Sequence, residues 1–409
     1  MTNNFDEELT VTLRERAGAV PPRPDLAGAA IRQAHGIRRR RRIAGGVAAA
    51  ALVALAVPVG LQAGDALNRG NAPLPPASQG PDNRTDEERV DEGPTEITPS
   101  EVTVQLEDLP VGAAPMVPYL DGSQLIVDGE PIDLGVDANQ LGQVAYAGGE
   151  VYYSVRSDEG ELTLVVPPGG EEPTEFPIDA GPWSSPDGRY AAYLAENTLT
   201  AIDTTSGAWS TVAVRRADIL QSVTFVGGDI YFTAGDVDPV LNRWRIGTTD
   251  IVSVDDVTRA TAVSPDGELV ADMYQIDDYG SDTRMTSLST GEVLWETTDF
   301  SVLGFSPDGR FVWGASDYGD GYADTMNVVL DAYSGEVVMR LDSPRDPERQ
   351  LSFKQSVFES DTTLLVSLEQ SGSAALVRCD LTTGGCELTT ELVDGVVPLE
   401  SETPYRLTS

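Results

Sequence analysis

The sequence predicts an all-β fold assembled from a repeated four-stranded unit. Three observations support this prediction: a turn that recurs at a regular spacing, an alternating apolar stretch after each turn, and a further predicted hairpin downstream. The turn is Ser-Pro-Asp-Gly, with copies that begin at Ser185, Ser264 and Ser306. Because internal repetition at a fixed period is typical of a repeat architecture, these copies decide the fold class before other signals are considered.

The residues of each turn have a structural role. Proline presets φ at about −65° in the second turn position, aspartate tolerates the next position, and glycine accepts the positive φ of the last. The stretches that follow, residues 189–194, 268–273 and 310–313, have the composition of half-buried strands. We therefore interpret the following residues as structural turn positions: Pro186, Asp187, Gly188, Pro265, Asp266, Gly267, Pro307, Asp308 and Gly309.

The spacing of the turns locates degraded copies. The second and third turns are 42 residues apart, and the first and second are 79 apart, which is close to two periods. Related strand–turn–strand stretches occur at residues 144–153, 223–232 and 356–366, which brings the copies to six. A second hairpin is predicted downstream of four turns, at residues 202–209, 288–293, 330–337 and 379–386.

Two hairpins in a period of about 40 residues amount to four strands, and a four-stranded sheet of that period is a blade of a β-propeller. A repeat region of about 300 residues predicts a β-propeller of about seven four-stranded blades, with six or eight as alternatives. The seventh blade is predicted to be composite. Residues 119–127 and 132–134 supply part of it, and residues 396–399 and 404–407 complete it, which removes exposed strand edges.

The turn and its apolar strand, followed by Asp-x-x-x-Gly-x before the outer strand, resemble the TolB-type, WD-repeat-like β-propeller family. The resemblance covers residue 102 to the C-terminus. The Trp-Asp and Gly-His signatures of true WD repeats are absent, which favours the TolB-type branch. Propellers of this type can accompany serine peptidase domains, but this chain has no such hydrolase domain and no Gly-x-Ser-x-Gly motif.

The composition changes three times before the predicted propeller. Five arginines at residues 38–42 precede 21 uncharged residues, 43–63, whose helix would span about 30 Å and cross a bilayer core. Arginines on the N-terminal side predict a cytoplasmic tail over residues 1–42. Residues 64–100 are rich in Pro, Asp, Glu and Asn and predict a disordered linker to a propeller over residues 101–409.

These segments predict a single-pass protein of the cell membrane, with a transmembrane helix over residues 43–63 and an extracytoplasmic propeller. A cleaved signal peptide or a buried helix are the alternatives. The long stretch before the apolar segment and the poor cleavage site at residues 61–63 favour a retained anchor. The tail resembles the short cytoplasmic regions of membrane-anchored envelope proteins of GC-rich bacteria. It either only sets the topology or contains a small segment that binds a partner, such as a transcription or cell-envelope factor.

The charge is divided unequally along the chain. Residues 1–42 hold nine Arg and five acidic residues, and the chain after residue 63 holds 18 basic and 61 acidic residues. The acidic part repels nucleic acid, so we expect no nucleic-acid partner. It favours cations or basic partners, or else is a solvated surface with no specific cation site.

Cys379 and Cys386 are the two cysteines of the chain, and they flank a predicted hairpin turn. Facing positions on paired strands bring Cβ atoms close enough for a disulfide. An even pair in an extracytoplasmic domain supports that bond, with two free buried thiols as the alternative.

The single histidine, His35, precedes the apolar segment, so the predicted propeller has no Ser-His-Asp or Cys-His arrangement and no histidine metal ligand. A phosphate-binding Gly-x-x-x-x-Gly-Lys motif is also absent. A pair of carboxylates could still hydrolyse glycosides, although no pair stands out among so many acids.

Two acidic loops fall at matching points of neighbouring blades. Their carboxylates could hold Ca²⁺, although neither loop has the EF-hand spacing, and polar inter-strand loops are the alternative. They also carry tyrosines, which makes them the predicted functional rim. The candidate ligands are Asp277, Asp278 and Asp282 in the first loop, and Asp317, Asp320 and Asp324 in the second.

The sequence thus predicts a non-enzymatic binding, scaffold or sensor module. It would contact the membrane through residues 43–63 and bind a protein or cell-wall ligand through the loop face of the propeller. No cofactor is expected other than Ca²⁺ in the acidic loops. The alternative is a carboxylate-dependent propeller hydrolase that acts on glycosides or esters.

Overall fold

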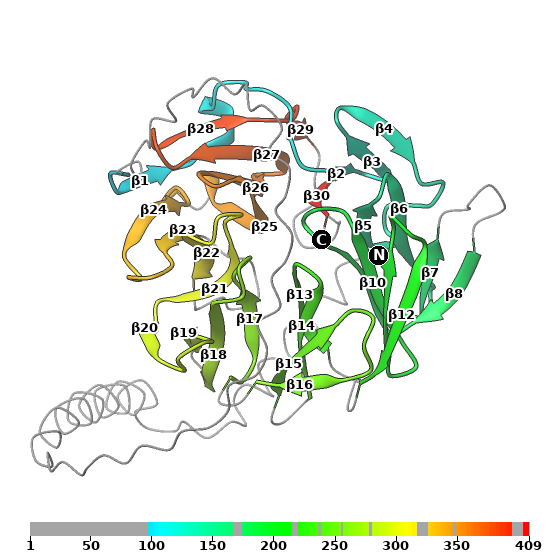
Figure 1. Cartoon of the computed structure of the whole chain (residues 1–409). Helices are drawn as coiled ribbons and strands as arrows, with labels where there is room; N and C mark the ends of the chain where they lie inside the picture. Colours follow the sequence, from blue (N-terminus) through cyan, green and yellow to red (C-terminus); the bar gives the residue numbers. More distant parts are fainter. Residues whose placement is uncertain are drawn as a thin grey trace, which may run out of the picture. The chain divides into compact units, whose positions relative to one another are not determined.

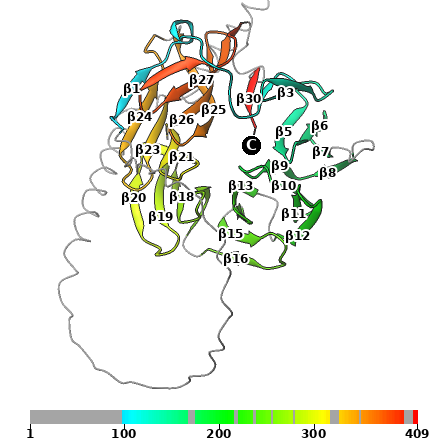
Figure 2. The same ribbon diagram turned by 45° about the horizontal axis from the view of Figure 1, so that its top comes forward.

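The computed structural model describes residues 97–166, 174–214, 220–235, 239–254, 257–277, 280–316, 326–346, 349–394 and 404–408. These residues form seven sheets around a central axis (Figures 1 and 2), which confirms the predicted seven-bladed β-propeller. No helix among them is long or apolar enough to cross a membrane. The predicted tail, the predicted transmembrane helix at 43–63 and the linker up to residue 96 lie outside the described residues and stay predictions.

Four blades are made of four consecutive strands each. In all four blades, neighbouring strands pair in the order in which they follow along the chain. The first two blades are β5 (Leu141–Ala147), β6 (Glu150–Arg156), β7 (Leu162–Val166), β8 (Thr174–Ile178), and β9 (Ala180–Ser184), β10 (Tyr190–Ala195), β11 (Thr198–Asp203), β12 (Ala208–Ala213). The next two are β13 (Leu220–Val226), β14 (Asp229–Ala234), β15 (Val240–Arg245), β16 (Ile251–Ser253), and β17 (Ala260–Val263), β18 (Leu269–Asp277), β19 (Gly280–Ser287), β20 (Val293–Thr297).

Two further blades carry an additional strand at the edge. They are β21 (Phe300–Phe305), β22 (Phe311–Ser316), β23 (Met326–Asp331), β24 (Val337–Asp342), and β25 (Leu351–Ser360), β26 (Thr363–Gln370), β27 (Ser373–Asp380), β28 (Gly385–Leu388). The additional strand of the first is β1 (Ser100–Thr103), which pairs in parallel with β24. In the second, the short β29 (Val393–Asp394) pairs with β27.

The closing blade combines both ends of the propeller sequence. Its innermost strand is the C-terminal β30 (Tyr405–Leu407), which pairs with β2 (Tyr119–Asp121), and β3 (Gln124–Val127) and β4 (Glu130–Asp133) follow outward. The register places Tyr119 opposite Leu407 and Asp121 opposite Tyr405. The composite blade predicted from residues 119–134 and 404–407 is therefore present, and residues 396–399 lie outside the described part.

The hydrophobic core lies between neighbouring blades. The second strand of a blade is covered on both faces, and every side chain of β14 and of β26 is buried. One cluster joins Tyr190 and Leu194 of β10 to Phe225, Phe232 and Trp244 of the next blade. Because both faces pack, these strands read as continuous apolar runs rather than as strict alternation, and burial of large side chains stabilises the ring.

The Ser-Pro-Asp-Gly turns share one hydrogen-bond pattern. In the first turn the Ser185 hydroxyl donates to Asp187 Oδ1 over 2.6 Å and accepts from the Tyr190 backbone N–H over 2.8 Å. Gly188 has a φ of 65°, in the left-handed region that favours glycine. The same two hydroxyl bonds recur in the turns that begin at Ser264 and Ser306. The serine and the aspartate therefore fix the turn together with proline and glycine.

Residues 97–116, which we call the strap, run along the outer edges of two blades (Figure 1). After β1 the chain forms a short 3-10 turn, η2 (Leu106–Asp108), and Val111 then makes a parallel bridge with Leu388 at the end of β28. Val104 and Leu106 are buried in the core cluster of these two blades. The strap thus covers two outer strand edges that would otherwise be free to pair.

A partly buried arginine holds the end of the strap. The Arg378 guanidinium donates to both carboxylate oxygens of Glu359 and to the backbone carbonyls of Ala113 and Ala114. The Glu359 side chain is fully buried, and its Oε1 also accepts from the Met116 N–H over 2.7 Å. Hydrogen bonds to Glu359 raise the pKa of Arg378 further. Beside it, Cys379 and Cys386 face each other across β27 and β28 and form the predicted disulfide.

Candidate functional site

A cavity of about 300 Å³ lies at the axis where the ring closes, and we call it the axial pocket. The innermost strands β5, β25 and β30 contribute to its walls, and Figure 2 shows β30 between the other two. Its polar lining residues are Asn139, Gln143, Arg156, Gln355 and Arg406. Its apolar lining residues are Leu120, Leu141, Val144 and Leu407, and Gly142 completes the wall.

The axial pocket lies toward the face of the ring opposite the tight turns. Asn139 precedes β5 and Arg156 ends β6, whereas the Gly148-Gly149 turn joins these two strands at their other end. In the six blades whose first two strands are consecutive in the chain, the turn between these strands is on that other face. Strands β18 and β22, which lead into the predicted acidic loops, end on the same face as the pocket.

Two contacts hold the closing strand β30 to its neighbours and shape the pocket. On one side Arg406 Nη1 donates to the Leu141 carbonyl oxygen over 2.9 Å. On the other side the Leu407 N–H donates to Gln355 Oε1 over 2.7 Å. The Arg406 side chain therefore reaches from β30 to β5, the first strand of the next blade. Its bond to Leu141 holds the guanidinium in the pocket wall.

A β-bulge shapes the wall contributed by β5. The pairing with β6 shifts register between Leu141 and Val144. The Gln143 N–H donates to the hydroxyl of the buried Ser154 over 2.9 Å, and an added Cβ on Gly142 would lie 2.5 Å from that same oxygen. A bulge changes the direction of nearby backbone and side chains. Here the missing side chain of Gly142 lets the β5 backbone approach the Ser154 hydroxyl.

The charge of the axial pocket is opposite to that of the surrounding domain. Among the described residues that line it, two are arginines and none is acidic. The chain after residue 63, in contrast, holds 61 acidic and 18 basic residues. Arg156 is exposed at the pocket, and within the described part of the chain it forms no ion pair with a carboxylate. The pocket is thus a local positive site on an acidic protein.

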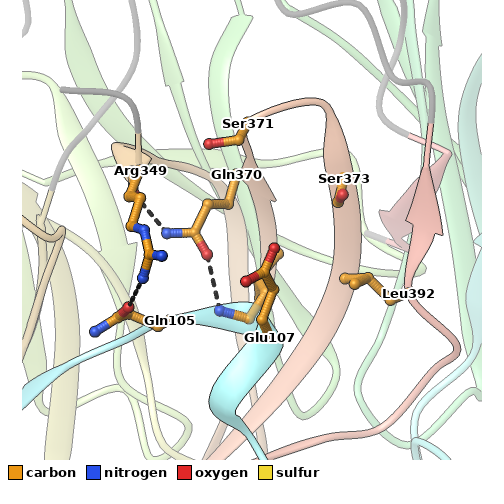
Figure 3. Close-up of a pocket in the computed structure, with 8 residues that line it drawn as sticks. Gln105, Glu107, Arg349, Gln370, Ser371, Ser373 and Leu392 are labelled. Atoms are coloured by element: carbon orange, nitrogen blue, oxygen red, sulfur yellow. Dashed lines mark hydrogen bonds between the residues drawn. The ribbon is translucent and has the colours of Figure 1, made fainter. Parts of the chain in front are cut away.

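A second cavity, of about 240 Å³, lies between the strap and the blade of β25–β28 (Figure 3). Three of its polar side chains, Gln105, Arg349 and Gln370, form hydrogen bonds within its walls. Gln370 accepts from the Leu106 N–H over 2.9 Å and donates to the Arg349 carbonyl, and Arg349 Nη1 donates to Gln105 Oε1 over 2.9 Å. These bonds, drawn as dashed lines in Figure 3, attach the strap to the ring. Leu106 is the residue that is drawn there without a label. We therefore interpret this cavity as part of the attachment between the strap and the ring, and not as a ligand site.

The predicted acidic rim is only partly described. Asp278 of the first loop and Asp317, Asp320 and Asp324 of the second lie outside the described residues. Asp277 ends β18, and Asp282 of β19 pairs with Gln275. Within the part of the chain that the structure describes, no group of three His, Cys, Asp or Glu residues is arranged to hold a metal ion. The Ca²⁺ site stays a prediction.

A buried ion pair at the base of the first acidic hairpin was not predicted. The side chain of Asp272 is fully buried, and Arg284 binds both of its oxygens over 3.0 Å. Burial raises the pKa of the Asp272 carboxyl, and Arg284 opposes that rise. The sequence signal was an aspartate inside the apolar run Leu269–Met273, which indicates a buried charge that needs a partner.

The class of protein follows from the strands: seven four-stranded blades that close through their two ends form a β-propeller. Neither the protein-family models nor the curated proteins include a match to this chain. Among solved structures it is similar to TolB from Acinetobacter baumannii, with 17% identity over 58% of this chain and 68% of that chain and a TM-score of 0.37.

Two further similar structures are a putative TolB from Agrobacterium tumefaciens and the β-propeller domain of the Trilobed protease from Pyrococcus furiosus. The first has 15% identity over 56% of this chain and 90% of that chain, with a TM-score of 0.38. The second has 14% identity over 61% of this chain and 84% of that chain, with a TM-score of 0.45. These similarities concern the fold alone.

Proposed function

We propose that this chain is a non-enzymatic binding module, a membrane-tethered extracytoplasmic propeller that binds a protein or cell-wall ligand in the axial pocket. The observation that supports the binding role is the composition of that pocket. Its described lining offers arginine and amide groups and apolar contacts, and it contains neither a carboxylate pair nor a nucleophile with an adjacent base. Hydrolysis of a glycoside by the predicted alternative would need two carboxylates on either side of the bond.

Two features support the placement outside the cytoplasm. The arginines at 38–42 precede the apolar segment 43–63, as in a single-pass protein with a cytoplasmic N-terminus. The Cys379–Cys386 disulfide is stable in an oxidising compartment and uncommon in the cytosol. The predicted linker over residues 64–100 would then separate the propeller from the membrane surface.

The test uses the full-length chain and two charge-reversal variants. Arg156→Glu changes the axial pocket, and Arg243→Glu changes an equally exposed arginine on β15, in another blade. The tagged proteins are used to recover partners from the source membrane and wall fractions. A partner that is lost with Arg156→Glu and kept with Arg243→Glu supports the proposal. Turnover of glycoside or ester substrates that Arg156→Glu abolishes would instead establish a propeller hydrolase.

A further inference from the structure

We propose that the axial pocket binds a monoanionic carboxylate carried on a small apolar group, such as the last residue of a peptide chain, with Arg156 as the residue that determines specificity. This inference rests on the proposed binding function and adds the chemical class of the ligand. It starts from the two arginines, which are the only charged residues among the described lining of the pocket.

The two arginines have different parts in this site. Arg406 already donates through Nη1 to the Leu141 carbonyl oxygen, so its guanidinium is held in the pocket wall. Arg156 ends β6, is exposed at the pocket, and has no ion-pair partner among the described carboxylates. A guanidinium presents planar, forked N–H donors that match the two oxygens of a carboxylate. Arg156 can therefore bind the ligand without giving up an ion pair within the described structure.

The field of the whole domain favours one negative charge over two. A chain with 61 acidic and 18 basic residues after residue 63 repels anions at long range, and each added ligand charge increases that repulsion. The charge of the exposed Arg156 can offset the repulsion for a monoanion more readily than for a phosphate dianion. The pocket thus selects a carboxylate over a phosphate.

The remaining walls define what carries the carboxylate. Leu120, Leu141, Val144 and Leu407 supply an apolar surface, and Asn139 and Gln143 supply amides that can bind a peptide group. A cavity of about 300 Å³ is at the small end of ligand pockets, so it accommodates one or two residues rather than a polymer segment. A short apolar C-terminal residue meets each of these conditions.

The probe is a panel of acetylated dipeptides, Ala followed by Ala, Val, Leu, Phe or Ser, each as the free acid and as the C-terminal amide. Binding to the full-length chain is measured by ligand-observed NMR and titration calorimetry. At least one free acid is expected to bind about tenfold or more tightly than its amide, and its affinity should fall as salt increases. Inorganic phosphate should compete only weakly.

Two neutral variants then assign the role of Arg156. Arg156→Gln should weaken binding of the acid about tenfold and leave binding of the amide unchanged, because it removes the charge and the forked donors and keeps a polar side chain. Arg243→Gln on β15 should change neither. Equal binding of acid and amide, no binding by any acid, stronger binding of phosphate, or an Arg156→Gln variant that binds the acid normally would each overturn the inference. Partner recovery that still depends on Arg156 would show that the binding function stands although its carboxylate ligand does not, whereas substrate turnover would refute the binding function itself.

Discussion

Closure of the ring depends on the burial of Tyr405 in the last strand. The Tyr405 side chain is 4% exposed and packs with Leu365, Leu376 and Leu407, and its ring lies 6.3 Å from that of Tyr119. We predict that Tyr405→Ala lowers the free energy of unfolding by about 3–5 kcal/mol, since truncation of a buried aromatic leaves a cavity. That loss is a large part of the total stability of a typical domain, about 5–15 kcal/mol.

Tyr405→Phe separates burial from hydrogen bonding. It keeps the ring and removes only the bond from the hydroxyl to the Glu391 carbonyl, which spans 3.1 Å, so the expected cost is about 1 kcal/mol. Tyr333→Ala is the matched control, because that tyrosine is 56% exposed and its loss should change stability by no more than about 0.5 kcal/mol.

The assay is urea denaturation of the full-length chain, followed by the fluorescence of its five tryptophans. If Tyr405→Ala destabilises only the closing blade, an additional transition should appear at low urea concentration. If the ring unfolds cooperatively, the whole denaturation curve should shift to lower urea concentration. The reasoning is refuted if Tyr405→Ala remains within about 1 kcal/mol of the wild type, or if Tyr405→Phe costs as much as Tyr405→Ala.

Three further predictions concern the strap, the turns and the pocket. Arg378→Met should lower the free energy of unfolding by about 3–5 kcal/mol, because the buried Glu359 loses its charge partner. Hydrogen exchange at residues 111–116 should increase. Unchanged exchange there would contradict the conclusion that Arg378 holds the end of the strap. Hydrogen bonds from Thr205 and then Arg189 lower the pKa of Asp203 to about 2, so the carboxylate stabilises the fold above pH 4 and this contribution is lost as the pH falls toward 2. Asp203→Asn should flatten that part of a curve of stability against pH. An unaltered slope would refute the assignment. Gly142→Ala should cost about 1–3 kcal/mol and weaken binding in the axial pocket, measured by denaturation and dipeptide titration, because the new Cβ displaces the hydroxyl that fixes the bulge; a variant with normal binding would show that the bulge is dispensable.

The fold could be predicted because its repeat is encoded locally. The turns at Ser185, Ser264 and Ser306 carry serine, proline, aspartate and glycine at fixed offsets, and each fixes one hairpin without help from the rest of the chain. Their spacing then sets the blade length. The composite blade followed from the need to protect strand edges, since neither residues 119–134 nor residues 404–407 make a blade alone.

Two features that the sequence did not reveal depend on distant pairing. The strand β1 binds β24 in parallel, and a four-residue segment in a polar stretch gives no local sign of its partner. Arg156 and Arg406 come from opposite ends of the propeller sequence and meet only because the ring closes. The acidic loops, by contrast, were conspicuous because their charges are adjacent in sequence, and such local density says little about where a ligand binds.

The position of β30 after all the other described strands of the propeller also sets the order of assembly during synthesis. Six blades and most of the seventh can be translated before the residues that complete the ring leave the ribosome. Until then Arg406 and Leu407 are missing from the axial pocket, so a nascent or prematurely ended chain would present blades without a finished binding site. The proposed ligand binding would therefore require synthesis of the strand that closes the propeller.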